Sequence, residues 1–348
     1  MLQMRKIITI NEKQEWTDYV KRALHYDFYH TWYYHSLDKS GLPILFVYEE
    51  NENYIAFPLL KRNIPGSDFF DFTSVYGYTG PISNMDFKSL DDDFMERFKA
   101  SFIAYLQTGQ NVTVFSRLHP FFDQERLMEK FSGVHANGKT VAIDLTTSIE
   151  SQRAGYRKSV KEKIRRLRKR DYEVRISTDI NDAIIFSEIY TENMLRIGAK
   201  DSYLFNHAYF VALLTSDEFD SKLFMVYKDG IAISGAIVVC TNEIMQVHLL
   251  ATRTTYLFES PAKLLTDEIT VIGRQLGYKY FNLGGGVNFK EDTLFGWKMG
   301  FSNLCFEFNS WRYIANNELY NTLLNERSLD PYSNVDFFPL YRSPVIAS

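Results

Sequence analysis

The densest group of chemically useful side chains is a run of cations between Arg153 and Arg175. This segment holds eleven Lys or Arg residues and three acidic residues, a local charge of +8, within a chain of net charge −4. The rest of the chain therefore carries −12 (−4 minus +8). Guanidinium and ammonium groups at this density are suited to binding phosphates. The asymmetry predicts a site for phosphates or nucleic acid on an otherwise acidic body.

Apolar residues recur at helical spacing within this run, which predicts one helix over residues 150–170. Val160, Ile164 and Leu167 form its apolar side and leave the cations exposed. The exposed face is either a solvated surface or a contact for the phosphates of a nucleotide-linked sugar or the acceptor end of a tRNA. The acidic remainder argues against DNA as a partner. We select Lys158 and Arg165 as candidate substrate-binding residues.

Other reactive side chains do not form a recognisable catalytic group. The sequence shows no metal-ligand spacing, nucleophilic triad or phosphate-binding glycine motif of the Walker type, so we expect no metal and no permanently bound cofactor. Cys240 and Cys305 lie in apolar, strand-like runs. His248 alternates with apolar neighbours, which is typical of an interior residue. Asp267 and Glu268 fall on a predicted helix, where we expect them to be solvated.

Length and hydropathy limit the class of protein. A chain of 348 residues exceeds the usual size of one hydrophobic core, which predicts two domains. The 28 Phe and 23 Tyr residues fit either thick cores or an aromatic-lined groove. The first residues do not read as a signal peptide, and no apolar run reaches the roughly 18 to 20 residues that span a bilayer. We expect a cytoplasmic protein with at most peripheral membrane contact.

A weak internal repeat indicates how the two domains are built. Residues 45–60 and 223–239 each read as a strand, a polar turn and a second apolar strand. Helical and strand patterns follow in similar order in both halves, which predicts a mixed α/β fold. We place one domain at residues 1–147 and the other at 148–311. A helical segment within residues 312–348 is expected to pack back on the first domain.

Four stretches carry a resemblance to a known family. They are TSVYGYTGPI at residues 73–82, FSRLHP at 115–120, VAIDL at 141–145 with the basic segment 156–174, and the run from 247 to 302 that includes GYKYFNLGGG and LFGWKMGFS. Their order and spacing resemble FemABX-like proteins, which add amino acids to peptidoglycan precursors. The resemblance implies two tandem GNAT-like domains with a substrate groove between them. It also implies a cytoplasmic acyltransferase that acts on an amine of a cell-envelope or polysaccharide precursor, carried on a nucleotide- or lipid-linked sugar.

The resemblance also suggests roles for individual residues. Lys298 lies where the family places a lysine facing the groove, and it is our candidate for stabilising the charge that develops in acyl transfer; the alternative is a surface lysine in a loop. Arg196 resembles a position that holds the acceptor's phosphates, although a cation at a helix C-terminus also serves the helix dipole. Four tyrosines either line the groove or pack in the core: Tyr76, Tyr78, Tyr203 and Tyr256.

The acyl donor is a co-substrate, and two candidates remain open. Enzymes that use acyl-CoA usually hold its pyrophosphate on a glycine-rich turn before a helix, but the corresponding residues 251–262 contain no glycine. Residues 76–80 have glycines without a following helix start. We therefore prefer aminoacyl-tRNA to acyl-CoA, although the long coiled-coil arm of some family members is absent. A GNAT-like module that binds a nucleotide-sugar or polysaccharide without catalysis is the alternative from another class.

Overall fold

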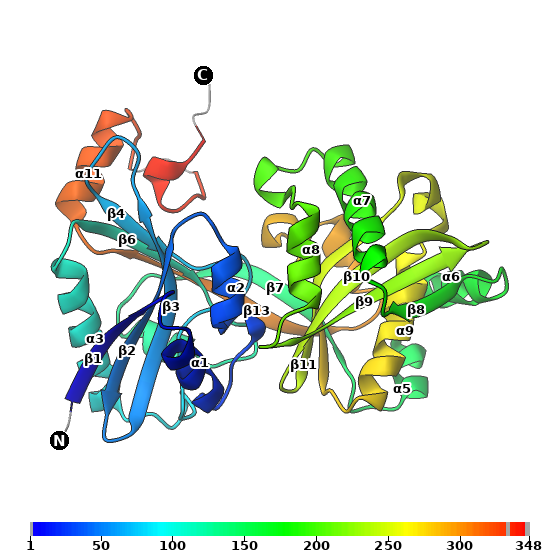
Figure 1. Cartoon of the computed structure of the whole chain (residues 1–348), viewed down its shortest axis with the longest axis horizontal. Helices are drawn as coiled ribbons and strands as arrows, with labels where there is room; N and C mark the ends of the chain where they lie inside the picture. The colour runs from blue at the N-terminus through cyan, green and yellow to red at the C-terminus, as the bar shows by residue number, and fades with distance from the viewer. Residues whose placement is uncertain (1–2, 332–334, 345–348) are drawn as a thin grey trace. The chain divides into compact units, whose positions relative to one another are not determined.

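The computed structural model describes residues 3–331 and 335–344, and the chain divides into two compact units (Figure 1). Unit 1 comprises residues 1–137 and 307–348, and unit 2 comprises residues 138–306. The divisions fall inside two long strands, β7 (Val134–Asp144) and β13 (Leu304–Ile314). They lie near, but not at, the expected boundaries of 147 and 311, because each of these strands continues without a break from one unit into the other.

Unit 1 contains a sheet with one parallel pair of strands. Its order is β1-β2-β3-β4-β6-β13, with the short β5 beside β3. Only β4 and β6 run parallel; the other neighbours described in this unit are antiparallel. The bounds are β1 (Gln3–Thr9), β2 (Leu42–Glu50), β3 (Asn53–Asn63), β4 (Phe70–Thr73), β5 (Ile82–Ser83) and β6 (Asn111–Arg117).

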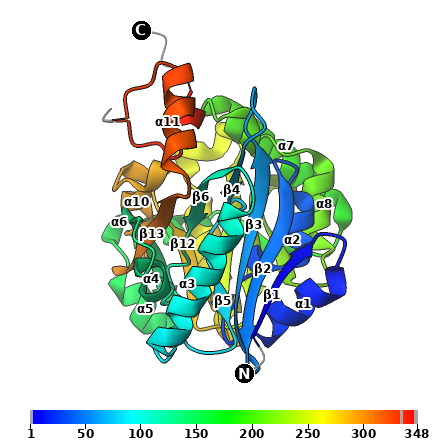
Figure 2. The same cartoon turned by 90° about the vertical axis from the view of Figure 1, so that its left-hand side faces the viewer.

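Alternating side chains of β2 supply two separate cores on the two faces of this sheet, as the period of a strand requires. Leu45 and Val47 pack with α1 (Lys13–Arg22). Phe46 and Tyr48 pack with the phenylalanines of α3 (Asp92–Gln107). Figure 2 shows α1 and α3 on opposite sides of the strands. The remaining helical turns are η1 (Phe28–His30), α2 (Trp32–Leu37), α4 (Glu125–Glu129), α11 (Asn317–Glu326) and η5 (Leu340–Arg342).

The C-terminal segment packs within unit 1 around a buried carboxylate. Asp71 on β4 is fully buried and accepts hydrogen bonds from Arg62 Nε at 2.8 Å, Arg342 Nε at 2.5 Å and the Tyr341 hydroxyl at 2.9 Å. Two cations and a hydroxyl compensate the cost of burying one negative charge. Tyr341 also joins Leu324 of α11 in a small apolar cluster. The segment is thus tied to the sheet by charge as well as by apolar packing.

Unit 2 repeats the arrangement with different strands. Its order is β7-β12-β11-β10-β9-β8, and only β11 and β12 run parallel among the described pairs. The hairpin β9–β10 occupies the place of β2–β3 in unit 1, which agrees with the internal repeat seen in the sequence. The bounds are β8 (Glu173–Ser177), β9 (Asp220–Lys228), β10 (Ile231–Thr241), β11 (Ile244–Thr252) and β12 (Tyr280–Gly284).

Helices cover both faces of the unit 2 sheet. On one face lie α7 (Ile180–Arg196) and α8 (His207–Leu214), and on the other lies α9 (Ala262–Gln275), as Figure 1 shows. The segment predicted as one helix over residues 150–170 is instead two helices, α5 (Ile149–Gly155) and α6 (Lys158–Arg168). Tyr156 and Arg157 between them have extended backbones. The break turns the Tyr156 ring into the core, where it contacts Phe301.

The two units exchange their last strands. In each unit a helix connects the two parallel strands, α3 between β4 and β6 and α9 between β11 and β12. The strand that follows β6 in the chain is β7, and its residues Val141–Asp144 pair with β12 of unit 2. The strand that follows β12 is β13, and its residues Ser310–Ile314 pair with β6 of unit 1. Each sheet is therefore completed by the chain that leaves the other unit.

Candidate active site

The parallel strands β11 and β12 of unit 2 separate toward their carboxyl ends. Their ladder pairs Ile244 with Tyr280 and ends where Gln246 pairs with Asn282. Beyond that point β11 continues to Thr252 but pairs only with β10 on its other side. In open α/β sheets, ligands bind outside the carboxyl ends of parallel strands. We refer to residues 247–252 of β11 and the end of β12 as the strand divergence.

A β-bulge lies at the start of the strand divergence. The register between β10 and β11 shifts so that Ile237 faces Leu249 while Val238 faces Val247, which makes His248 the extra residue. A bulge redirects side chains and is frequent beside active sites. His248 is buried, as its apolar neighbours indicated, and its Nε2 lies 2.9 Å from the hydroxyl of Tyr209 on α8. The bulge thus directs a histidine toward the α7–α8 face.

Two buried amides close the base of the strand divergence. Asn282 Nδ2 donates to Gln246 Oε1 at 2.8 Å, and Asn282 Oδ1 accepts from the backbone N–H of Gly284 at 2.9 Å. Both side chains are almost fully buried. Buried amides require partners of this kind because an unsatisfied polar group costs about 1–3 kcal/mol. The pair fixes the last paired residues of β11 and β12, and therefore the point at which the strands part.

After β12 the chain folds into a compact loop held by Asp292. Its carboxylate accepts from the backbone N–H of Val287 at 3.0 Å and of Phe295 at 2.9 Å, which caps α10 (Thr293–Lys298). These backbone hydrogen bonds, the one from Phe295 first, lower the pKa of Asp292. Gly286 has no room for a side chain, because a Cβ there would lie 2.0 Å from the carbonyl oxygen of Lys290. The loop therefore has one tight conformation.

Lys298 ends α10 and reaches back to the end of β12. Its Nζ donates to the carbonyl oxygen of Gly285 at 2.5 Å. Burial lowers the pKa of Lys298 to about 8, and the carboxylate of Asp292 acts in the opposite direction. Near neutral pH the side chain is therefore mostly an ammonium ion in a poorly hydrated place. An ammonium group at the carboxyl end of a parallel strand can stabilise an oxyanion or a phosphate.

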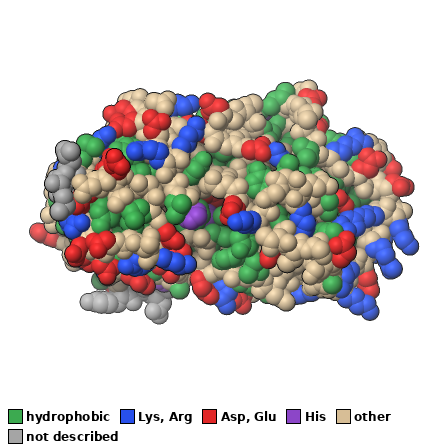
Figure 3. Space-filling model, turned by 90° about the horizontal axis from the view of Figure 1, so that it is seen from below, with side chains coloured by type: hydrophobic (Ala, Val, Ile, Leu, Met, Phe, Trp, Pro, Cys, Tyr) green, Lys and Arg blue, Asp and Glu red, His purple; other side chains and the backbone are tan. Residues whose placement is uncertain are grey.

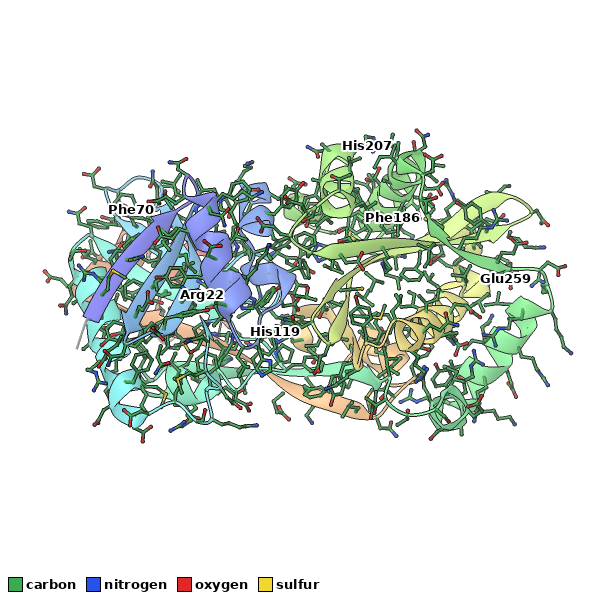
Figure 4. The ribbon with its side chains drawn as sticks, turned by 60° about the horizontal axis from the view of Figure 1, so that its bottom comes forward. Arg22, Phe70, His119, Phe186, His207 and Glu259 are labelled. Atoms are coloured by element: carbon green, nitrogen blue, oxygen red, sulfur yellow. The ribbon has the colours of Figure 1, made fainter. Side chains whose placement is uncertain are left out.

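The turn before α9 contains no glycine and is already occupied by side chains of the protein. It forms the helical turn η3 (Thr254–Glu259), and the backbone N–H of Thr254 donates to Glu192 Oε1 at 2.7 Å. That hydrogen bond lowers the pKa of Glu192. Lys163 Nζ on α6 donates to the carbonyl oxygen of Phe258 at 3.1 Å, and Arg170 Nη1, just after α6, lies 2.6 Å from Glu259 Oε1. Glu259 is labelled in Figure 4.

No contact within the described part of the chain joins the other predicted site residues of unit 2 to Lys298. Arg196 ends α7, is exposed, and donates to Asn193 Oδ1 at 2.7 Å. Tyr203 is half-buried in the helical turn η2 (Asp201–Tyr203). Tyr256 in η3 is half-buried against the apolar core of unit 2. Lys158 and Arg165 both lie exposed on α6.

In unit 1 the two predicted tyrosines differ in exposure. Tyr78 is only 7% exposed, and its ring contacts those of Tyr29, His119 and Phe308. It is thus a core residue, the alternative left open for each tyrosine. Tyr76 is 42% exposed, and its carbonyl oxygen accepts from the Tyr34 hydroxyl at 3.0 Å.

The structure adds residues that the sequence did not reveal and corrects one expectation. The amides of Gln246 and Asn282 lie within apolar runs that gave no chemical signal. Asp267, expected to be solvated, is 1% exposed; Arg153 Nη2 lies 2.7 Å and Arg168 Nη2 2.6 Å from its Oδ2. Both arginines are more than 95 residues away in the sequence, so its neighbours could not indicate this pairing.

The described residues contain neither a cluster suited to a metal ion nor a helix suited to span a membrane. No group of three or more His, Cys, Asp or Glu side chains there has the arrangement of a metal site. Within residues 3–331 and 335–344, no helix combines the length and apolar character needed to cross a lipid bilayer.

Comparison with known proteins agrees with this architecture. The family model of the acetyltransferase (GNAT) domain matches residues 154–299. No sequence relative was found among proteins of curated function. FemX has a similar structure, with a TM-score of 0.71, 14% identity, and coverage of 92% of this chain and 99% of FemX.

Two further solved structures extend the comparison. One is the C-terminal domain of a protein described as a lysylphosphatidylglycerol synthetase from Agrobacterium fabrum (TM-score 0.56, 13% identity, 91% of this chain and 96% of that chain). The other is a tandem GNAT protein from the clavulanic acid biosynthesis pathway (TM-score 0.51, 10% identity, 90% of this chain and 99% of that chain). Residues 154–299 are thus similar to a GNAT domain, and the chain as a whole shares its fold with FemX and with a tandem GNAT protein, the fold class that the FemABX resemblance implied.

Proposed function

We propose that this protein is an acyltransferase that moves an aminoacyl group, or another acyl group, to an amine of a cell-envelope or polysaccharide precursor. One observation carries the proposal: Lys298 Nζ lies at the carboxyl end of β12, where β12 has parted from its parallel neighbour β11. A partly buried cation at such a position matches the requirement of acyl transfer, in which negative charge develops on the carbonyl oxygen.

The reaction is a nucleophilic substitution at a carbonyl carbon. The neutral amine of the acceptor attacks the acyl carbon, and the carbonyl oxygen becomes an oxyanion that the Lys298 ammonium stabilises. Collapse of this intermediate breaks the bond to the donor and leaves an amide, while the amine proton passes to the leaving group or to water. Positioning supplies much of the remaining rate enhancement. The closely held loop of Asp292 keeps the ammonium group in place.

The turn before α9 favours aminoacyl-tRNA over acyl-CoA as the donor. A pyrophosphate needs free backbone N–H groups and close approach to the chain. Here the N–H of Thr254 already donates to Glu192, and the Phe258 carbonyl is held by Lys163. The match to a GNAT acetyltransferase domain favours acyl-CoA instead. The names FemX and lysylphosphatidylglycerol synthetase are consistent with an aminoacyl donor and an acceptor in the cell envelope.

A donor competition tests this proposal. The purified chain is incubated with a mixture of radiolabelled aminoacyl-tRNAs, or with acetyl-CoA, together with a nucleotide-linked sugar-peptide precursor of peptidoglycan. We expect label to move from the tRNA to an amine of the precursor and no turnover of acetyl-CoA. Tight binding and turnover of acetyl-CoA would instead support the CoA-dependent alternative. Lys290→Ala, which removes an exposed cation from the same loop, serves as the matched control for Lys298→Ala.

A non-catalytic binding module predicts a different pattern. In that case no donor would give an acyl product, and the precursor would still bind to the Lys298→Ala and Arg196→Ala variants. Under our proposal, Lys298→Ala removes product formation while the wild type forms product. Isothermal titration with the precursor, run beside the transfer assay, separates the two readings.

A further inference from the structure

A second group of cations on unit 2 lines a pocket between three helices. Helices α5, α6 and α9 line an open cavity of about 430 Å³, a size within the range of ligand sites. Most of its polar lining is cationic, and Tyr156 and Ile164 provide its apolar wall. The cationic lining includes Arg153, Lys161, Arg165 and Lys169.

Some of these cations are fixed by the protein itself. Asp267 pairs with Arg153 and Arg168 and accepts from the Tyr156 hydroxyl at 3.0 Å. Lys161 Nζ donates to the carbonyl oxygen of Ala154 at 3.0 Å, a bond that adds no negative charge. One buried carboxylate therefore orients two guanidinium groups at the wall of the cavity. Positive charge remains in excess there.

The other cations of the cavity have no carboxylate partner. Neither Arg165 nor Lys169 has an ion pair or a side-chain hydrogen bond within the part of the chain that the structure describes, and both are exposed. Lys158 at the start of the helix is paired only weakly, at 3.9 Å from Glu162. Charges that are not neutralised by the protein are available for an anionic ligand.

The cations continue beyond the cavity as a stripe. Lys158, Lys161, Arg165 and Lys169 recur every three or four residues, so they lie on one side of α6. At 1.5 Å per residue the stripe is about 16 Å long. That length exceeds one diphosphate and fits several successive phosphates of a strand. Figure 3 shows Lys and Arg side chains gathered at its right-hand end, where unit 2 carries α5 and α6.

The apolar side of α6 is not available for a membrane. Val160, Ile164 and Leu167 are each at most 4% exposed because they pack in the core of unit 2. A helix that binds the membrane interface inserts its apolar face between lipids. The free face of α6 offers charge alone, which suits the phosphate backbone of a nucleic acid.

We propose that the cavity and the stripe, together called the α6 surface, bind the phosphate backbone of an RNA strand without reading its sequence. The choice of RNA rests on the proposed function, in which the acyl group arrives on a tRNA. The α6 surface holds the body of the donor, and Lys298 acts on its acyl end. The acidic remainder of the chain repels RNA elsewhere and so directs it to this surface.

Binding of deacylated tRNA tests this proposal without requiring transfer. We expect the double variant Arg165→Ala/Lys169→Ala to bind tRNA at least tenfold more weakly than the wild type at low salt. The slope of log K against log salt concentration should become shallower by about 1.5, because two phosphate contacts are lost. The matched control is Arg175→Ala/Lys279→Ala, which removes two exposed cations of unit 2 that already face Glu173 and Glu243. Its affinity and slope should equal those of the wild type.

Three outcomes would overturn the α6 surface as an RNA site. The control variant could lose as much affinity as the α6 variant, which would indicate a diffuse charge effect. A uridine diphosphate-sugar could bind there while tRNA does not. Vesicles of phosphatidylcholine and phosphatidylglycerol could bind without competition from tRNA. If instead the α6 variant loses tRNA binding but no donor supports transfer, the proposed function fails and the RNA site stands.

Discussion

The two parallel strand pairs of this protein share a topology but end differently. In unit 2 the ladder between β11 and β12 stops at Gln246 and Asn282. In unit 1 the ladder between β4 and β6 continues into the following loop. The N–H of Ser74 donates to the carbonyl oxygen of Phe115 at 2.9 Å, and the N–H of Thr79 donates to that of Arg117 at 3.0 Å. Backbone hydrogen bonds therefore keep the parallel strands of unit 1 joined at the position where the parallel strands of unit 2 separate. We call the first the sealed pair and the second the open pair.

A buried side chain also joins the segments that follow β4 and β6 in unit 1. Gln124 Nε2 donates to the carbonyl oxygens of Thr79 and Pro81, each at 2.8 Å, and its Oε1 accepts from the N–H of His119 at 2.7 Å. Gln124 is fully buried and His119 is 2% exposed; Figure 4 labels His119. The two units thus share a fold, but the parallel strand ends are joined in unit 1 and separated in unit 2. This difference places the expected chemistry in unit 2.

The largest expected effect is loss of transfer when the cation is removed from the open pair. Lys298→Met keeps the length of the side chain but cannot stabilise an oxyanion. We expect the turnover number to fall by roughly 10²–10³, as for removal of one oxyanion donor. Steady-state transfer kinetics measure it, with Lys290→Met as the control. If the Lys298→Met variant kept the wild-type turnover number, the open pair would not differ from the sealed pair in function.

The sealed pair should respond to mutation through stability instead. Gln124→Ala removes the side-chain partner of the Pro81 carbonyl oxygen and of the His119 N–H in a buried place, whereas the Thr79 carbonyl oxygen still lies 2.9 Å from His30 Nε2. We expect the free energy of unfolding to fall by about 2–4 kcal/mol. Urea denaturation measures the change, and the rate of transfer per folded molecule should stay within twofold of the wild type. A large loss of rate in a still folded variant would show that unit 1 takes part in the chemistry.

Two glycine substitutions test the loop that follows β12, one at Gly286 within the loop and one at Gly296 in the helix α10 after it. Gly286→Ala places a Cβ 2.0 Å from the Lys290 carbonyl oxygen and 2.4 Å from Asp292 Oδ1, so the loop must shift. We expect a stability loss of about 1–3 kcal/mol and a several-fold slower transfer. Gly296→Ala in α10 meets no atom within 4 Å and should be neutral or stabilising by up to about 1 kcal/mol. Equal effects from the two would argue against a tightly held loop.

The smallest expected effect between pH 7 and pH 8 is the pH dependence of transfer. Burial lowers the pKa of Lys298 to about 8, so the ammonium form is present below that pH and is lost as the pH rises through it. We expect the rate to halve near pH 8 relative to pH 7 and to fall tenfold per unit above pH 9. Any residual activity of Lys298→Arg should lack this decrease, since arginine stays charged. A flat profile to pH 9.5 in the wild type would exclude a role for the Lys298 charge.

Local sequence patterns predicted the elements well, because their causes are local. Helix α8 has the predicted limits, His207–Leu214, since its apolar residues and its Asn206 cap are neighbours in the chain. The hairpin β9–β10 followed from alternating apolar residues around Asp229 and Gly230. The break between α5 and α6 was missed because cations continue through Tyr156, and only the core contacts of that ring reveal it.

The candidate site was predictable only in part, because its geometry depends on distant pairings. Lys298 was found through a family resemblance, but the carbonyl oxygen that it contacts was not. Gln246 and Asn282 are polar residues inside apolar strands, and their hydrogen bond joins positions 36 residues apart. The burial of Asp267 likewise depends on arginines from α5 and α6. A single sequence does not encode these contacts in any local pattern.

The exchange of strands between the units also sets an order of completion during translation. Unit 1 is synthesised first, but β6 acquires its partner β13 only after unit 2 has been made, since Ser310 of β13 follows Arg117 of β6 by 193 residues (310 − 117). At about 5–20 residues per second, the edge of β6 stays open for roughly 10–40 s. Unit 2 has all its strands once residue 306 has emerged. The nascent chain must therefore protect an unpaired strand edge, a known route to aggregation, until β13 appears.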